Sequence, residues 1–451
     1  MALKIGLEIH GYLLTKEKLF CNCKAEHGLK KVSPNMNICP ICTGQPGAKP
    51  MLPNSSAIRK ILQIGLMLGC RINKKFLWQR KHYDWPDLPK GYQTTISGSY
   101  SIPVGERGEF LGIRIREVHL EEDPAKWDPV SGCVDYNRSG MPLVEIVTEP
   151  DFTSSQQVSL WLKQLLLTLS YIKALDKDSG IKADVNVSLH GDRIEVKNVN
   201  SISSIVEAIN YEAERQKKEK PKKKETRAWL PEKKQTVKMR EKEEAADYRF
   251  IPEPDLPIIK LTQQEINNLK NKLPESPAEK LNKLLKKHKI KPKQAEILTS
   301  NLELVEFFEQ IAKKVPADFA LHWITIELLR VLNYNKKSLS EVEINPQHFI
   351  ELLQLVKNKK ITELKAKRIL NEFIPRSSSP LKQAKSMERI TNKAELAVIV
   401  DKIIKNNQKA VQDYKSGQQS ALNFLMGQIM QESKRRADYK TSLEVLKEKL
   451  K

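Results

Sequence analysis

Four of the six cysteines are spaced in the way that proteins bind a structural metal ion. Cys21 and Cys23 form one close pair, and Cys39 and Cys42 form a second, with fifteen residues between the pairs. Two such pairs allow four thiolates to meet tetrahedrally around one zinc ion, which leaves no coordination position for a reacting water molecule. The spacing therefore predicts a structural zinc site. The alternative is a set of free, buried thiols in a reducing compartment.

A second group of reactive side chains alternates with apolar residues. In a strand, residues two apart project to the same side, so the alternating segments would present on polar faces Glu8, His10, Asp184 and Lys197. Glu145 lies within the apolar run 142–147, where an unpaired carboxylate would be costly. Carboxylates, one imidazole and a lysine together indicate a divalent-cation site with a phosphate beside it. The alternative is the ordinary solvated face of an antiparallel sheet.

Motifs of several other enzyme classes are absent from the chain. It contains no G-x-x-x-x-G-K-[ST] phosphate loop, no G-x-G-x-x-G fingerprint and no G-x-S-x-G elbow. With four cysteines assigned to zinc, an acyl-enzyme mechanism has no obvious nucleophile. The sequence therefore favours metal-assisted phosphoryl transfer over hydrolysis, with Glu and His as ligands and Lys197 neutralising phosphate charge.

The elements that must position these side chains change in type along the chain. Period-2 alternation predicts strands at 3–10, 113–122, 143–147, 183–189 and 194–197, and helical spacing predicts helices over 158–172 and after Ser201. Beyond Pro257, Leu and Ile recur at helical spacing. We therefore expect an α+β chain with a sheet-rich domain over residues 1–259, an all-α domain over 260–380 and a small helical tail domain over 395–451.

The net charge of +22 is distributed unevenly. Residues 1–259 hold 40 basic and 33 acidic residues, whereas residues 260–451 hold 37 and 22. An excess of this sign attracts a polyanion, unless it is only a lysine-rich solvated surface. Preferred phosphate contacts in the tail are Lys434, Arg435 and Arg436, whose alternative role is to interact with a helix C-terminus. The basic run 217–224 is a solvated loop in the simplest interpretation, and a contact for the polyanion in the other.

Length and hydropathy limit the class of protein further. A chain of 451 residues is too long for one ordinary hydrophobic core, so more than one domain is expected. It has no apolar run near the ~18 residues that span a membrane, and its first residues resemble neither a signal peptide nor a transit peptide. We expect a cytoplasmic protein without a membrane partner.

Long strings in this sequence resemble the GatB family, which supplies one of the subunits of the glutamyl/aspartyl-tRNA amidotransferases. They include residues 6–10 (GLEIH), 83–93 (YDWPDLPKGYQ), 119–123 (HLEED), 135–151 (DYNRSGMPLVEIVTEPD) and 195–201 (EVKNVNS). The tail matches at residues 411–417 and 421–430, so the resemblance covers essentially the whole chain in order.

The resemblance implies an ATP-dependent ligase that serves translation. In that family the GatB subunit transfers the γ-phosphate of ATP to the side-chain carboxylate of Glu or Asp esterified to tRNA(Gln) or tRNA(Asn), and ammonia then displaces the phosphate. The ammonia comes through a channel from a partner, the amidase subunit, and a small third subunit helps to hold the two together. The sheet-rich domain would be the cradle-like catalytic domain and the tail a YqeY-like, tRNA-binding domain.

The family's Mg²⁺ positions fall in this sequence on Glu8, His10, Glu122 and Glu145, with Asp184 near the same basin. The resemblance supports the zinc site without requiring it, because some members of the family lack the cysteine pairs. Two other readings stay open: a noncatalytic tRNA-binding module of the same fold, which the intact acidic residues argue against, and a redox or catalytic role for the cysteine cluster.

Overall fold

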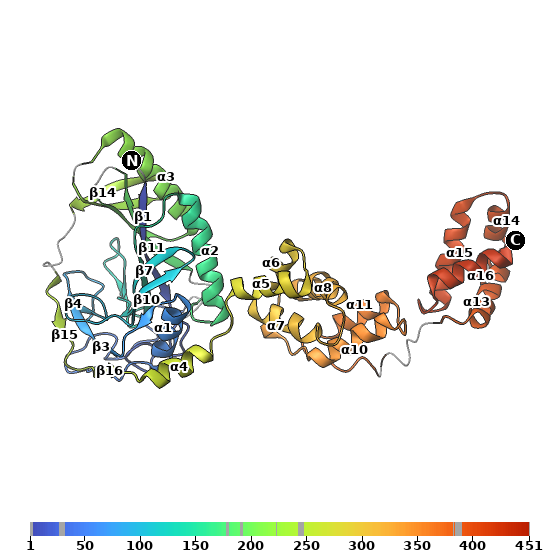
Figure 1. Ribbon diagram of the computed structural model, residues 1–451, viewed down its shortest axis with the longest axis horizontal. Coiled ribbons are helices and arrows are strands. Elements are labelled where there is room, and N and C mark those ends of the chain that lie inside the picture. The colour runs from blue at the N-terminus through green and yellow to red at the C-terminus, as the bar shows by residue number, and fades with distance from the viewer. Residues whose placement is uncertain are drawn as a thin grey trace. The chain divides into compact units, whose positions relative to one another are not determined.

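The chain is described by a computed structural model that covers residues 3–26, 32–176, 180–189, 193–221, 223–241, 248–381, 383 and 390–450. It divides into two compact units, Met1–Pro277 and Ala278–Lys451, which Figure 1 colours from blue to red along the chain. Lys222 of the basic run lies outside the described residues. Within the described part, no helix is both long enough and apolar enough to cross a bilayer.

The first unit is built on a twelve-stranded sheet in which ten strands follow the order β14-β13-β12-β11-β1-β10-β7-β5-β4-β15. Beside this path, β6 pairs with β7, and β2 pairs with β6. The strands are β1 (Lys4–Tyr12), β2 (Arg71–Ile72), β4 (Gln79–His82), β5 (Tyr92–Thr95), β6 (Gly105–Phe110), β7 (Ile113–Glu122), β10 (Pro142–Thr148), β11 (Ile181–Ser188), β12 (Ile194–Val199), β13 (Glu225–Leu230), β14 (Gln235–Glu241) and β15 (Ile251–Pro252).

Two short strand pairs lie outside this sheet. One joins β3 (Lys75–Phe76) to β16 (Ile259–Lys260), and the other joins β8 (Lys126–Trp127) to β9 (Val134–Asp135). The expected strands over residues 3–10, 113–122, 143–147, 183–189 and 194–197 are confirmed as parts of β1, β7, β10, β11 and β12. Period-2 alternation is a reliable signal here because one face of each strand is apolar and buried.

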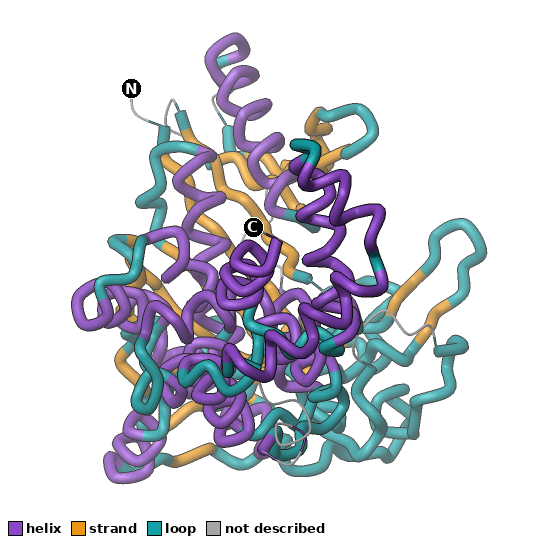
Figure 2. Tube along the Cα trace, turned by 90° about the vertical axis from the view of Figure 1, so that its right-hand side faces the viewer, coloured by secondary structure: helices purple, strands orange, loops and turns teal. Residues whose placement is uncertain are grey.

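Three helices supply the other half of the first core. They are α1 (Ser55–Met67), α2 (Ser155–Tyr171) and α3 (Ile202–Glu219), and Figures 1 and 2 show helices lying along the sheet. The apolar face of β1, with Leu7 and Ile9, belongs to one buried cluster with Trp161 of α2 and Ile209 of α3. Each helix begins at a side-chain cap; in α3 the Ser201 hydroxyl accepts the amide of Ser204 at 3.0 Å. The helices predicted over 158–172 and after Ser201 are therefore confirmed.

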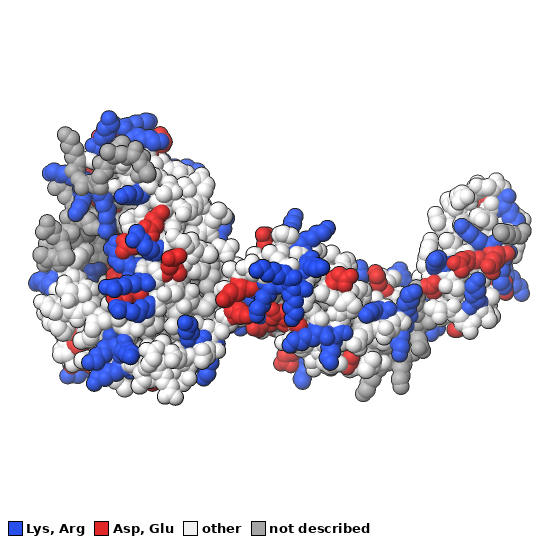
Figure 3. Space-filling model, in the orientation of Figure 1, with Lys and Arg blue, Asp and Glu red and all other residues white. Residues whose placement is uncertain are grey.

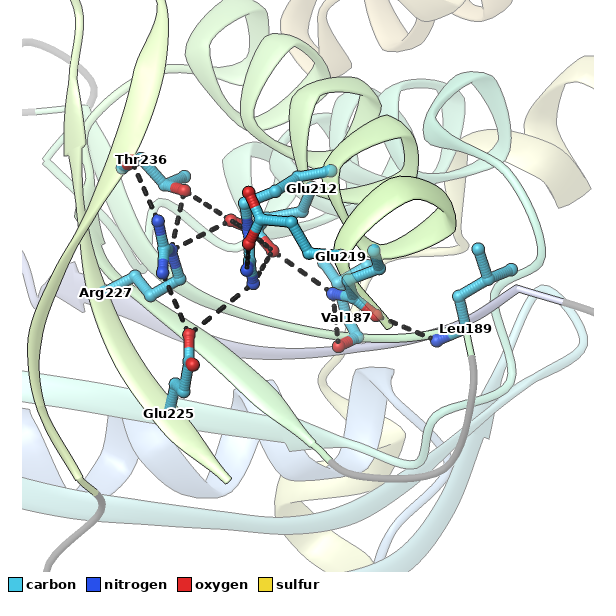
Figure 4. A network of polar contacts seen from close by, with 9 residues as sticks. Val187, Leu189, Glu212, Glu219, Glu225, Arg227 and Thr236 are labelled. Atoms are coloured by element: carbon cyan, nitrogen blue, oxygen red, sulfur yellow. Dashed lines mark hydrogen bonds and ion pairs between the residues drawn. The ribbon is translucent and has the colours of Figure 1, made fainter. Parts of the chain in front are cut away.

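Helix α3 is joined to β13 by a group of paired charges, buried except for Glu219, which we call the α3 ion cluster: Glu212, Arg215, Glu219, Glu225 and Arg227 (Figure 4). Glu212 is fully buried, and its carboxylate lies 2.9 Å from Nη2 of Arg215 and 3.2 Å from Nε of Arg227. Buried charges are tolerated only when they are paired and hydrogen-bonded. The cluster therefore fixes α3 against β13.

The C-terminal turn of α3 is also bonded directly to the sheet. Gln216 donates from Nε2 to the Val187 carbonyl at 3.2 Å and accepts the Leu189 amide at 3.0 Å (Figure 4). Both partners belong to β11 or follow it directly. The last turn of α3 is thus held by side-chain bonds on two sides, to β13 through the ion cluster and to β11 through Gln216.

The division between the units comes later than the predicted boundary after residue 259. Helix α4 (Gln263–Asn271) begins with a capping box between Thr262 and Glu265, and Leu269 packs against the first core, as do Leu261 and Leu273. The predicted domain boundaries stay predictions; the helical pattern beyond Pro257 could not show that α4 packs on the first core, because a helical period does not reveal which core a helix joins.

The described residues of the second unit form helices joined by loops, with two isolated β-bridges and no strand. Its helices are α5 (Pro277–His288), α6 (Pro292–Thr299), α7 (Leu302–Ile311), α8 (Ala317–His322), the π-helix η2 (Trp323–Leu328), α9 (Leu329–Tyr334), the 3₁₀-helix η3 (Leu339–Glu341), α10 (Pro346–Lys357), α11 (Glu363–Asn371), α13 (Lys393–Asn406), α14 (Gln408–Lys415), α15 (Gln419–Glu432) and α16 (Tyr439–Leu450). Its buried apolar residues form one cluster within 284–373 and another within 390–450. The α+β fold class is confirmed, and the split of the helical region into two domains stays a prediction.

We expect Glu212→Ala to destabilise the first unit by about 3 kcal/mol, because it leaves Arg215 and Arg227 buried without their shared carboxylate. The matched control on the same helix is Glu207→Ala. Glu207 makes a largely exposed pair with Lys234 at 2.8 Å, so its loss should be far less destabilising than that of Glu212. Urea denaturation measures both variants, and hydrogen exchange should rise first in β13 and β14. Equal losses for the two variants would contradict the structural role of the cluster.

Candidate functional site

Five neighbouring strands place their polar side chains on the sheet face opposite the helices. The register pairs Glu8 with Asp184 across β1 and β11, and pairs His10 with Glu145 across β1 and β10. Glu145 is in turn opposite His119 of β7. Alternate residues share a face, so this register gathers carboxylates and imidazoles from distant parts of the sequence.

The first group on this face is centred on Glu145. Its Oε2 atom lies 2.8 Å from Nε2 of His119 and 3.5 Å from Nε2 of His10. His119 also lies 3.7 Å from Oε1 of Glu121, which accepts a hydrogen bond from the Thr95 hydroxyl at 2.7 Å. One ligating atom from each of His10, Glu121 and Glu145 fits within 4.8 Å of the other two. This group could hold a cation through one nitrogen and two oxygen atoms.

In this group the two histidines and Glu145 stabilise one another in their charged forms. Burial disfavours the imidazolium, but the Glu145 carboxylate outweighs burial and raises the pKa of His10 and of His119 to about 9. Against the effect of its own burial, the two imidazolium groups hold the pKa of Glu145 well below its usual range. Without a cation, the group is therefore balanced by protons on the two histidines. A metal ion ligated by His10 would have to displace a proton.

The second group contains three carboxylates, those of Glu8, Asp184 and Glu195, whose ligating atoms lie within 4.8 Å of one another. Lys197 Nζ lies 2.6 Å from Asp184 and 2.8 Å from Glu195. Arg193 Nη2 lies 3.0 Å from Glu8. Burial raises the pKa of Glu8, and the nearby Glu145 raises it further. Although burial acts to lower the pKa of Lys197, Asp184 and Glu195 outweigh it and raise that pKa.

Both groups border one cavity of about 590 Å³. This volume is in the range of small-molecule and cofactor sites. Its lining combines the two carboxylate groups with cations and aromatic rings, among them Glu8, Glu145, Arg116, Arg193, Lys197, Lys81, Tyr248 and Phe250. Carboxylate oxygens suit Mg²⁺, while guanidinium and ammonium groups suit phosphate. The cavity therefore contains both carboxylates that could bind a metal ion and cations that could bind the phosphates of a nucleotide.

The structure brings together most of the residues predicted for chemistry. Glu8, His10, Glu145, Asp184 and Lys197 lie on the same face and within the two groups just described. The expected clustering of these residues is seen, whereas their catalytic and metal-binding roles stay predictions.

Glu122 is the exception: the structure does not bring it together with the other predicted ligands, and its metal-binding role stays a prediction. It alternates with Glu121 on β7, so it points away from the polar face; there its carboxylate bonds to the Lys90 ammonium and accepts the Thr94 amide at 3.0 Å. The carboxylate that belongs to the first group is that of the neighbouring residue, Glu121. Sequence reasoning also missed His119 and Arg193. Counting by twos along β7 from Glu117 would have found His119 and Glu121, whereas nothing local to the sequence points to Arg193.

The four cysteines meet as the spacing predicts. Their sulfur atoms lie within 4.8 Å of one another, with 4.0 Å from Cys42 to Cys23 and 3.9 Å from Cys42 to Cys39. A tetrahedral site with Zn–S bonds of about 2.3 Å has edges of about 3.8 Å, so the donor set fits zinc. The hydrogen bond from Cys21, opposed by burial, lowers the pKa of Cys42 to about 5. A thiolate is the form that binds metal.

The basic trio of the tail occupies the turn between α15 and α16. Lys434 and Arg435 have positive φ angles of 50° and 60° and are exposed. Arg436 is half-buried; its carbonyl accepts the Ile390 amide at 2.9 Å. Two of the three side chains are therefore accessible to a phosphate, and the predicted tRNA contact stays a prediction.

Comparison with known proteins covers almost the whole chain. Residues 3–267 match the family described as "GatB/GatE catalytic domain", and residues 306–450 match the "GatB domain". The chain is 44% identical to the GatB subunit of the aspartyl/glutamyl-tRNA(Asn/Gln) amidotransferase of Methanothermobacter thermautotrophicus, covering 99% of this chain and 100% of the relative. The subunits of the same name from Methanopyrus kandleri and Methanocaldococcus jannaschii are 40% and 42% identical, each over 99% of this chain and 98% of the relative.

We expect the purified chain to contain about one zinc ion, bound by the cysteine cluster. Cys42→Ser should remove most of the metal and lower the thermal midpoint, because structural zinc stabilises the folded state. Cys133→Ser is the matched control, since Cys133 is exposed and lies outside the cluster. Elemental analysis reads the metal content. A folded preparation without zinc would contradict the structural-metal interpretation, and disulfides there would favour a redox role.

The triad His10–Glu145–His119 should make stability depend on pH in a defined direction. The histidine pKa rises from about 6.5 in the unfolded chain to about 9 in the folded chain. The contribution is therefore complete below pH 6.5 and is lost as the pH rises through 9. We expect the difference in unfolding free energy between the wild type and Glu145→Gln, measured without added divalent cations, to shrink between pH 6 and pH 10. A difference that stays constant over this range would contradict the charge pairing.

Proposed function

Because the chain belongs to the GatB family of aspartyl/glutamyl-tRNA(Asn/Gln) amidotransferase subunits, we propose that it activates the amino acid of a misacylated tRNA with ATP. The side-chain carboxylate of Glu-tRNA(Gln), Asp-tRNA(Asn) or both attacks the γ-phosphorus of ATP, and ADP leaves. Ammonia then attacks the carbonyl carbon of the acyl phosphate, and phosphate leaves, which gives the amide.

The observation that supports this proposal most directly is the shared cavity. A γ-phosphate and a carboxylate repel each other, so the site must offer positive charge to both. Arg193 and Lys197 border the cavity from one side and Arg116 lies in its lining as well. In the structure, Arg193 and Lys197 contact Glu8, Asp184 and Glu195. We propose that these cations turn to the phosphate groups of ATP when the nucleotide binds.

Mg²⁺ fits the donor set, with His10, Glu121 and Glu145 as the first candidates and Glu8 and Asp184 beside them. When bound, it would neutralise phosphate charge and hold the phosphate oxygens in place. His119 positions Glu145 through the 2.8 Å contact and does not itself line the cavity. Its role in the proposal is to orient the carboxylate, as second-layer groups do for metal ligands.

The remaining parts of the reaction belong to partners. We infer that the amidase subunit supplies ammonia and that the small third subunit stabilises the complex, as the family resemblance implies. The cysteine cluster holds structural zinc in this proposal, and the turn with Lys434, Arg435 and Arg436 contacts the tRNA backbone. The absence of a nucleophilic motif in the chain agrees with glutamine hydrolysis on another polypeptide.

We expect Glu145→Gln, and the double variant Glu8→Ala/His10→Ala, to lower amidation by at least about 100-fold, because preorganised electrostatic groups of this kind contribute on that order. Glu109→Gln on an exposed position of β6 is the control and should amidate normally. The assay uses ATP, glutamine and the reconstituted complex, with Glu-tRNA(Gln) and Asp-tRNA(Asn) tested separately.

Glutamine hydrolysis by the partner should persist in all three variants. Full amidation by the double variant would exclude the proposed metal site. A wild-type complex that binds tRNA but amidates neither substrate would instead support the noncatalytic tRNA-binding module.

A further inference from the structure

A run of lysines joins α3 to β13 and is not used by the proposed reaction. Residues 217–224 contain six lysines, one glutamate and one proline. The described lysines Lys217, Lys218, Lys220, Lys223 and Lys224 are all exposed. Figure 3 shows blue side chains gathered at the end of the first unit where Figure 1 labels α3 and β14. The lysine run is therefore a compact basic surface on the first unit.

The glutamate within the run and the one that follows it are both paired with arginines. Glu219 places Oε2 at 2.6 Å from Nη1 of Arg215, and Glu225 places Oε2 at 2.8 Å from Nη1 of Arg227 (Figure 4). Both carboxylates belong to the α3 ion cluster, in which three glutamates meet two arginines. These two carboxylates are therefore paired with arginine and form no ion pair with Lys218, Lys220 or Lys224.

Three of these exposed lysines take part in no ion pair between described residues. Among the ion pairs between described residues, none involves Lys218, Lys220 or Lys224, whereas Lys217 is paired with Glu214 at 2.6 Å. Interaction with the helix dipole accounts for basic residues in the last turn of α3. It does not account for Lys224, which directly precedes β13. The positive surface thus extends from the helix end to the start of the strand.

The start of β13 leads directly into the cavity. Thr226 is two residues beyond Lys224, lines the cavity and pairs in register with Glu195. A strand rises about 3.3 Å per residue, so the backbone of Lys224 is about 7 Å from that of Thr226. The next residue, Arg227, points to the opposite face and is held by the ion cluster. The same buried cluster therefore fixes the position of both the lysine run and the cavity wall.

We propose that Lys218, Lys220 and Lys224 bind phosphate groups of tRNA next to its aminoacylated end. The proposal rests on the proposed function, because only a tRNA substrate must place its aminoacyl end in this cavity. The nucleotides adjoining that end then pass over the rim, where the lysines release condensed counterions from their phosphates. This contact is on the first unit and is distinct from the turn with Lys434, Arg435 and Arg436 in the second.

The test compares two triple variants of the full chain. Lys218→Ala/Lys220→Ala/Lys224→Ala removes the proposed contacts, and Lys16→Ala/Lys74→Ala/Lys75→Ala removes the same charge from exposed positions outside the cavity lining. Fluorescence anisotropy follows binding of tRNA and of an acceptor-arm minihelix between 50 and 300 mM KCl. Each lost phosphate contact lowers the slope of log K against log salt by about 0.7 to 0.9.

We expect the first variant to bind both RNAs at least tenfold more weakly at low salt, with a slope smaller by about 2, and the control to bind as the wild type does. Replacing the three lysines by arginine should restore the slope. Thermal unfolding establishes that the variants are folded; if the triple variant is not, Lys224→Ala alone should reduce the slope by about 0.7 to 0.9.

An unchanged affinity and slope in the first variant would overturn the proposal. So would unchanged RNA binding with weakened binding of the amidase partner, which would assign the lysines to an acidic protein surface. Amidation by the wild-type complex tests the proposed function separately. If that activity is present and the lysine variants bind RNA normally, only the present inference fails.

Discussion

Charges on the polar face of the sheet have to compensate one another, because neighbouring strands and the cavity walls remove much of the surrounding water. Glu145 lies between two imidazole groups, and Lys197 lies between Asp184 and Glu195. Each of these ionised groups is tolerated because a partner of opposite sign is within about 3.5 Å. An ion that entered this face would have to exchange with these partners, because each charge there is already paired.

At β13, paired charges lie on both faces of the sheet. Thr226 lines the cavity, while Arg227 reaches into the α3 ion cluster on the other side. The parallel pairing of β12 with β13 requires a crossover, and α3 supplies it. Because Glu212 sits inside that crossover helix, one buried carboxylate joins the helix to the strand behind the cavity. The lysine run is the outer end of the same connection.

Charged residues are distributed differently in the two units. In the first unit, acidic residues are gathered at the cavity and in the α3 ion cluster, where they are paired with arginine, lysine and histidine. Most of the net positive charge falls after residue 259, on helices whose cores contain few charged groups. Exposed positive charge is therefore present on both units, whereas the paired carboxylates and cations described above belong to the first.

Local sequence determined which side chains share a face. Alternation with a period of two is a property of the strand backbone alone, so Glu8 and His10, or Asp184 and Asn186, had to point the same way once those segments were strands. The cysteine spacing was equally local, and it correctly predicted that four sulfur atoms meet. The family resemblance, carried by long strings, added the reaction class, which spacing could not supply.

Only the tertiary structure decided which faces meet. Glu121 and Glu122 are adjacent in the sequence, and their assignment depends on the pairing of β7 with β10 and on Lys90, which comes from another part of the chain. Arg193 reaches Glu8 only because β12 and β1 flank β11 in the sheet. The packing of α4 on the first core and the pairing of Glu212 with Arg227 are likewise long-range effects, set by packing and by the cost of burying unpaired charge. No local pattern in the sequence records those contacts.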